Sequence, residues 1–122
     1  MTLIDTSAWI EQLRINGAAT VRRQVELLLA SGDAAWCPLV RLELWNGARS
    51  AGERAVLTEM HETLPSLAMD APVWERATTL ATGAREQGIT IPVTDVLIAA
   101  CARHHDVSLL HDDRHFDLIA PL

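Results

Sequence analysis

The chain has 122 residues, 49% of them hydrophobic, and a formal net charge of −6 at pH 7. A chain of this length can build one domain with a substantial core and is too short for two. The acidic balance argues against a broad basic surface for nucleic acid. No run approaches the roughly 18 to 20 apolar residues of a membrane span, and the N-terminus lacks the features of a secretory signal, so we expect a cytoplasmic protein.

Lysine is absent, and all ten strongly basic residues are arginine. This absence excludes mechanisms that place a lysine ammonium beside an acidic pocket. Cys37 and Cys101 form no CxxC pattern, which argues against a disulfide framework and against a zinc ribbon. We therefore expect two free, buried thiols.

The first half of the chain alternates short apolar runs with helical patterns. The predicted elements are a strand over 2–4, a helix over 8–13, a helix over about 18–30 that stops near Gly32, a strand over 34–37, and helices over 39–46 and 51–63. Asp5, Thr6 and Ser7 are residue types that cap helices, and they stand directly before the first helix. Pro38 is well placed to begin the helix that Gly47 would end.

The second half continues the same alternation. The predicted elements are an extended segment over 66–69, a long helix from Val73 that Gly88 closes, a helix over 95–105 that Thr94 caps, and a strand over 107–110. Short strands that alternate with helices indicate an α/β fold with a short parallel β-sheet flanked by α-helices on both faces. Such sheets bind ligands beyond the carboxyl ends of their strands, so the functional site is expected there.

Carboxylates recur at the positions where this sheet would hold its site. Asp5 follows the first strand, Asp95 follows the extended stretch ITIPV, and Asp112 and Asp113 follow the last strand. Glu43 lies in a helix beside an apolar stripe and has no basic residue three or four positions away. The aspartates can also be helix caps or first-turn acids, worth roughly 0.3 to 1 kcal/mol each, and Glu43 can be an ordinary solvated helix residue.

Converging carboxylates would repel one another and require a counter-cation. Oxygen-rich sites of this kind suit Mg²⁺ or Mn²⁺. One or two such ions can activate water and stabilise charge on a phosphoryl group, which favours metal-dependent phosphodiester cleavage. Aspartyl-phosphate chemistry is less favoured, because it relies on a lysine and because DTS after the first strand lacks the second aspartate of a DxD motif.

The remaining chemically active residues leave alternatives open. His104, His105, His111 and His115 suggest zinc, but no cysteine pair or HExxH motif accompanies them, and they are interpreted as helix-end and surface residues. His111 or His115 can instead contact a substrate phosphate or position the acidic loop. The four tryptophans are interpreted as core or subunit contacts rather than base-stacking platforms. The arginines considered for RNA phosphate contact are Arg14, Arg22, Arg23, Arg41, Arg49 and Arg114.

Four fragments of the chain, in this order, resemble the PIN-domain ribonucleases, in particular the VapC-type toxins of bacterial toxin-antitoxin pairs. The fragments are LIDTSAWI, LVRLELWNGAR, GITIPVTDVLIAACA and LLHDDRHFDLIA. The resemblance covers nearly the whole chain and implies a single PIN-like domain over residues 1–122. It also implies an acidic pocket of Asp5, Glu43, Asp95 and Asp113, in which Asp5, Asp95 and Asp113 are nearest a Mg²⁺ ion, or Mn²⁺ in its place.

The family pattern near the C-terminus is similar to H-x-D-x-x-F, which corresponds here to His111, Asp113 and Phe116. Asp113 is therefore preferred to Asp112 as the last acid of the pocket. Arg114 and His111 are candidates for RNA contact. The hydroxyls expected to support the carboxylates are those of Thr6, Ser7 and Thr94.

The resemblance implies a metal-dependent endoribonuclease that cuts structured RNA, such as tRNA or ribosomal RNA, and inhibits growth. It further implies a cognate VapB-type antitoxin whose tail occupies the acidic groove, a homodimer, and a toxin-antitoxin hetero-oligomer. The alternative is a noncatalytic partner-binding module of the same fold, whose acidic groove receives a basic peptide.

Overall fold

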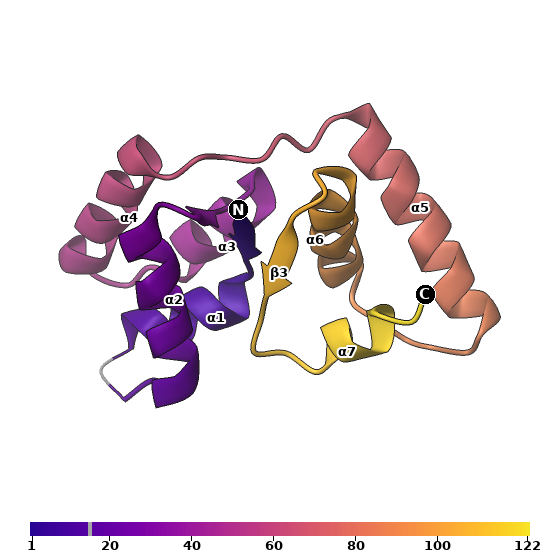
Figure 1. The fold of residues 1–122 in the computed structure, drawn as a ribbon, viewed down its shortest axis with the longest axis horizontal. Coiled ribbons are helices and arrows are strands. Elements are labelled where there is room, and N and C mark those ends of the chain that lie inside the picture. The colour runs from indigo at the N-terminus through magenta and orange to yellow at the C-terminus, as the bar shows by residue number, and fades with distance from the viewer. Residues whose placement is uncertain (15) are drawn as a thin grey trace.

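The structure is a computed structural model that describes residues 1–14 and 16–122 (Figure 1). In this part of the chain it contains three strands and seven helices. Their bounds are β1 (Thr2–Ile4), α1 (Thr6–Leu13), α2 (Ala19–Ser31), β2 (Ala34–Ala35), α3 (Pro38–Gly47), α4 (Ala51–Thr63), α5 (Ala71–Glu86), α6 (Val93–His104), β3 (Ser108–Leu110) and α7 (His115–Ile119).

The three strands form a parallel sheet in the order β2-β1-β3. In register, Leu3 of β1 lies opposite Ala35 of β2 and Leu109 of β3. Beyond the last pair, the backbone N–H of Asp5 donates to the carbonyl of Leu110 at 2.9 Å. The central strand therefore delivers Asp5 to the carboxyl edge of the sheet, next to the segment that follows β3.

The predicted strand over 34–37 is shorter in the structure, because only Ala34 and Ala35 belong to β2. Trp36 forms an isolated parallel bridge with Ser66, supported by the Leu67 N–H, which donates to the Trp36 carbonyl at 2.8 Å. The extended segment expected over 66–69 therefore runs beside the end of β2 and adds one bridge to the sheet.

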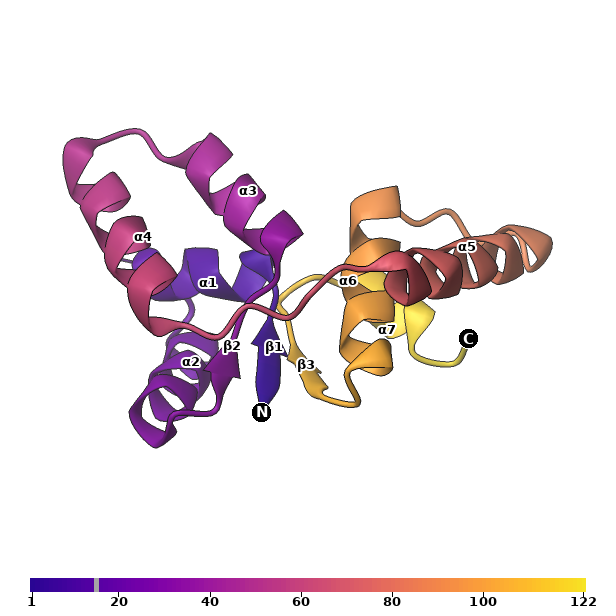
Figure 2. The ribbon, with the colours of Figure 1, turned by 90° about the horizontal axis from the view of Figure 1, so that it is seen from above.

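Helices lie on both sides of the sheet, with α2 and α6 on opposite sides (Figure 2). The β1 residues Leu3 and Ile4 are fully buried. Every residue of α6 from Val96 to Ala102 is buried, as its apolar pattern predicts. The expected α/β fold is thus confirmed, and the same central helix that fills the core carries Asp95 in its first turn.

Two of the four tryptophans are core residues. Trp9 and Trp36 are each 1% exposed, whereas Trp45 is 37% and Trp74 56% exposed. Core packing therefore accounts for Trp9 and Trp36, and contact with another subunit stays a prediction for the other two. The expectation of free, buried cysteines is confirmed for both positions.

Helix α6 begins earlier than the sequence pattern predicts. Pro92 occupies its N-cap position, and the Pro92 carbonyl accepts hydrogen bonds from the N–H groups of Asp95 at 3.1 Å and Val96 at 3.2 Å. The prediction that Thr94 caps this helix is wrong, because Thr94 already lies inside the first turn. Proline fixes φ near the helical value, so the chain enters the helix without a side-chain cap.

Gly32 is the C-cap of α2, as predicted, and Gly88, predicted to close the long helix, directly follows Gln87, the C-cap of α5. Gly32 has φ 75° and Gly88 has φ 71°, a region where residues with a Cβ are strained. Among the described residues, no helix is both long and apolar enough to cross a bilayer.

Candidate active site

Asp5 is the buried centre of an acidic pocket at the carboxyl edge of the sheet. Its residue is 3% exposed, and its Oδ2 accepts hydrogen bonds from the Ser7 hydroxyl at 2.6 Å and the Ser7 backbone N–H at 3.0 Å. Burial raises the pKa of Asp5 and the charge of Asp113 adds to the rise, while the bonds from Ser7 oppose it. Asp5 also serves as the N-cap of α1, so the cap interpretation and the site interpretation apply to one carboxylate.

Glu43 reaches the same pocket from α3. The Thr6 hydroxyl donates to Glu43 Oε1 at 2.9 Å, across 37 positions of sequence. Burial raises the pKa of Glu43, and the negative charge of Asp5 raises it further, against the effect of the Thr6 bond. The expected hydroxyl support is thus divided: Ser7 holds Asp5, and Thr6 holds Glu43.

Asp95 lies in the first turn of α6, and the negative charges of the three other acids all raise its pKa. Burial comes first among the causes that raise its pKa to about 6, followed by repulsion from Asp113 and Asp5 and, more weakly, from Glu43. His115 lowers the pKa but does not cancel the rise. The structure therefore brings the four predicted acids together. Their mutual repulsion creates a demand for positive charge.

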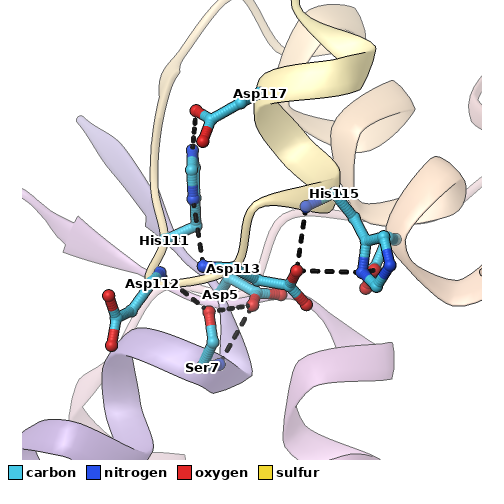
Figure 3. A network of polar contacts seen from close by, with 8 residues as sticks. Asp5, Ser7, His111, Asp112, Asp113, His115 and Asp117 are labelled. Atoms are coloured by element: carbon cyan, nitrogen blue, oxygen red, sulfur yellow. Dashed lines mark hydrogen bonds and ion pairs between the residues drawn. The ribbon is translucent and has the colours of Figure 1, made fainter. Parts of the chain in front are cut away.

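Asp113 enters the pocket from the segment between β3 and α7. Its Oδ1 accepts a hydrogen bond from the His115 backbone N–H at 2.9 Å, which ties the carboxylate to the first turn of α7 (Figure 3). Asp112 differs, because it is exposed and its carboxylate is directed away from Asp5 and Asp113. The geometry places Asp113, rather than its neighbour, beside the other acids.

Ser7 connects Asp5 to the segment that carries Asp113. Its hydroxyl donates to Asp5 and also accepts a hydrogen bond from the Asp112 backbone N–H at 2.9 Å (Figure 3). One side chain thus fixes both the central acid and the loop that carries Asp113. Thr94 contributes no comparable support: it is exposed, and within the described part of the chain its hydroxyl makes no hydrogen bond to a carboxylate.

His111 supports the segment between β3 and α7 that carries Asp113. Its Nδ1 accepts a hydrogen bond from the Asp113 backbone N–H at 3.3 Å, and its Nε2 lies 3.7 Å from Asp117 Oδ1. The ring packs against Phe116 with centroids 4.9 Å apart. These contacts make His111 and Phe116 a framework for Asp113, while RNA contact by His111 stays a prediction.

His115 is a member of the pocket that the sequence did not assign to it. Its Nδ1 lies 2.9 Å from Asp113 Oδ1 and 3.3 Å from Asp95 Oδ2. One potential ligand atom from each of these residues lies within 4.8 Å of the others. The signal available in the sequence was the D-x-H spacing of Asp113 and His115. That spacing brings both side chains to one side because α7 begins at His115.

Three of the six predicted arginines, Arg14, Arg49 and Arg114, lie near acids of the pocket. Arg14 and Arg49 line a groove of about 640 Å³ between α1, α3 and α4, and Glu43 lines the same groove. Arg114 is exposed beside Asp113, and it makes no ion pair with any residue that the structure describes. Their contact with RNA stays a prediction.

The donor set fits a small divalent cation. Carboxylate oxygens are the preferred ligands of Mg²⁺ and Mn²⁺, and a site of this kind keeps several waters on the ion. Burial raises the pKa values of Asp5, Glu43 and Asp95, and repulsion from neighbouring acids adds to each rise. Asp95, Asp113 and Asp5 are the acids best placed to hold such an ion.

Comparisons with known proteins show the family of this chain. The PIN domain model matches residues 2–121. The chain is 36% identical to Ribonuclease VapC11 of Mycobacterium tuberculosis over 124 aligned positions, which cover 98% of this chain and 92% of that protein. It is 30% identical to Ribonuclease VapC21 of the same organism, over 84% of this chain and 76% of that protein.

A solved structure supports the fold. The DNA-bound VapBC structure from Salmonella typhimurium has a TM-score of 0.79 at 17% sequence identity and covers 95% of this chain and 89% of that chain. The likeness at this identity shows a shared fold, and the family model and the relatives carry the assignment. The chain belongs to the PIN domain family and, within it, to the VapC-type ribonuclease toxins.

Proposed function

We propose that this protein is a metal-dependent endoribonuclease and the toxin of a type II toxin-antitoxin pair, which cleaves structured RNA such as tRNA or ribosomal RNA. The observation that carries the proposal is the convergence of four acids from β1, α3, α6 and the segment after β3. Asp95 interacts electrostatically with the other three, Asp5, Glu43 and Asp113. Helix capping accounts for Asp5 singly but not for this convergence.

The acids have different roles in the proposed reaction. Asp5, Asp95 and Asp113 hold Mg²⁺ or Mn²⁺, which when bound supplies charge stabilisation at the scissile phosphate and favours deprotonation of water. Glu43, held by the Thr6 hydroxyl, orients the attacking water. The raised pKa of Glu43 suits a carboxylate that receives a proton during the reaction.

The substrate and partners are proposed by similarity to relatives. Ribonuclease VapC11 supports RNA as the substrate. The solved VapBC structure from Salmonella typhimurium, which has this fold, supports a VapB-type antitoxin as the partner. We further propose that residues 1–122 act as one domain, that the toxin forms a homodimer within a toxin-antitoxin hetero-oligomer, and that it works in the cytoplasm. Arg114 and the groove residues Arg14 and Arg49 are proposed to contact RNA phosphates.

The test is cleavage of total cellular RNA by purified, antitoxin-free protein in the presence of Mg²⁺ or Mn²⁺. The proposal expects defined cleavage products with the wild-type chain and none with Asp5→Ala. Asp112→Asn is the matched control, because it alters an acid of the same loop that lies outside the pocket. Intact RNA with the folded wild-type chain would contradict the proposal and favour a noncatalytic module that binds a basic peptide.

A further inference from the structure

We propose that His115 is a direct metal ligand, through Nδ1, and that this nitrogen makes the site prefer Mn²⁺ to Mg²⁺. The inference deepens the proposed function and rests on it, because it concerns the same metal site. It adds a residue and a metal selectivity that the four-acid pattern does not contain.

The separations around His115 are those of neighbouring ligands on one ion. Its Nδ1 lies 2.9 Å from Asp113 Oδ1 and 3.3 Å from Asp95 Oδ2. Adjacent ligands of an octahedral ion with metal-ligand distances of roughly 2.0 to 2.1 Å lie about 3 Å apart. The three side chains can therefore share an ion with little movement.

The Nδ1 atom is not engaged as an ordinary hydrogen-bond donor or acceptor. It is buried, and although two carboxylate oxygens are near, neither is aligned for a hydrogen bond, so Nδ1 has no such partner within the described residues. Buried polar atoms in proteins nearly always have a partner. The nitrogen is thus close to both carboxylates without an aligned hydrogen bond to either, and an ion held jointly with Asp95 and Asp113 would bind all three groups.

The backbone fixes His115 in this position. Asp113 Oδ1 accepts the His115 backbone N–H at 2.9 Å, and Phe116, the next residue, is buried against His111. The start of α7 therefore holds the carboxylate and the imidazole on one side of the chain. A side chain placed by such contacts loses little freedom when it binds an ion.

Imidazole changes the metal preference of an oxygen site. Mg²⁺ is a hard ion that favours oxygen ligands. Mn²⁺ also binds oxygen but, as a transition-metal ion, accepts a nitrogen ligand more readily than Mg²⁺ does. A site with only the carboxylates of Asp5, Asp95 and Asp113 would accept either ion. Addition of the His115 nitrogen should strengthen Mn²⁺ binding selectively.

The test is electron spin echo envelope modulation of Mn²⁺ bound to the full-length, antitoxin-free chain. We expect ¹⁴N coupling from a coordinated imidazole in the wild type and its loss in His115→Ala. His61→Ala is the matched control, because this histidine is exposed in α4 and lies outside the pocket. The coupling should persist in that variant.

Titration calorimetry provides the second readout. In His115→Ala the dissociation constant for Mn²⁺ should rise at least about tenfold, while that for Mg²⁺ changes less than about threefold. Bound Mn²⁺ without ¹⁴N coupling in the wild type, or an equal loss of both ions in the variant, would overturn the His115 inference and leave the acidic metal site intact. Failure of the wild type to bind either ion would overturn the proposed metal site itself.

Discussion

Asp5 and Asp95 occupy one pocket but are held in different ways. Asp5 is fixed by the fold, because Ser7 gives it two hydrogen bonds and the central strand sets its position. The Asp95 carboxylate accepts no hydrogen bond from the described residues, and its nearest partner is His115 at 3.3 Å. The Asp5 side of the pocket is therefore preorganised by the chain. The Asp95 side depends on a bound cation to hold its carboxylate.

The largest effect should come from the side that depends on the cation. Asp95→Asn removes a proposed metal ligand, so we expect the initial rate of RNA cleavage to fall at least about a hundredfold while the fold is retained. Circular dichroism checks the fold. The exposed control Asp112→Asn should stay close to the wild-type rate. An equal rate for Asp95→Asn and the control would show that Asp95 is not needed for cleavage.

The second effect separates the two sides by their response to metal. A saturating ion that binds only the folded chain stabilises it by about 2.7 kcal/mol at about one hundred times the dissociation constant. We expect Mn²⁺ to raise the thermal midpoint of wild type and Ser7→Ala, and not that of Asp95→Asn. Differential scanning fluorimetry measures this, and a full Mn²⁺ response in Asp95→Asn would contradict the division.

The preorganised side should respond in metal-free protein. Ser7→Ala removes a hydroxyl that binds Asp5 and receives the Asp112 N–H, and we expect a loss of about 1 to 2 kcal/mol in the free energy of unfolding. Urea denaturation in EDTA measures it. Ser108→Ala is a control in β3 whose exposed hydroxyl makes no hydrogen bond to the described residues. Equal midpoints for the two variants would show that Ser7 does not fix this side.

The last effect is the pH dependence of the metal-free chain. The pKa of Asp95 rises from 3.8 to about 6 on folding, mainly through burial and repulsion. The folded state then binds more protons in this window, so the Asp95 contribution to stability falls as pH rises from about 4 through about 6. Urea midpoints across this range should decline less in Asp95→Asn, and parallel profiles would contradict the assignment.

Much of the fold could be predicted because local patterns determine it. The apolar run before Asp5 forms the central strand, and the pattern of α6 correctly predicts a helix buried on most sides. Thr94 was expected to cap α6 because its side chain suits that role, but Pro92 starts the helix two positions earlier. Local capping preference was overridden by the fixed backbone of proline.

The site was less predictable where it depends on tertiary contacts. The bond between Thr6 and Glu43 spans 37 positions, so the sequence could not decide which hydroxyl supports which acid. His115 enters the pocket only because α7 packs near the start of α6, and the sequence left its role open between loop positioning and phosphate contact. Residue types and spacing predicted the acids, whereas their partners required the fold.

The most direct test of the central claim is metal dependence of cleavage by the wild-type chain. Antitoxin-free protein is incubated with total RNA after EDTA treatment, before and after Mn²⁺ or Mg²⁺ is restored, and the new RNA ends are sequenced. The four-acid site predicts no cleavage in EDTA and the same set of ends once either ion returns. Undiminished cleavage in EDTA would contradict it.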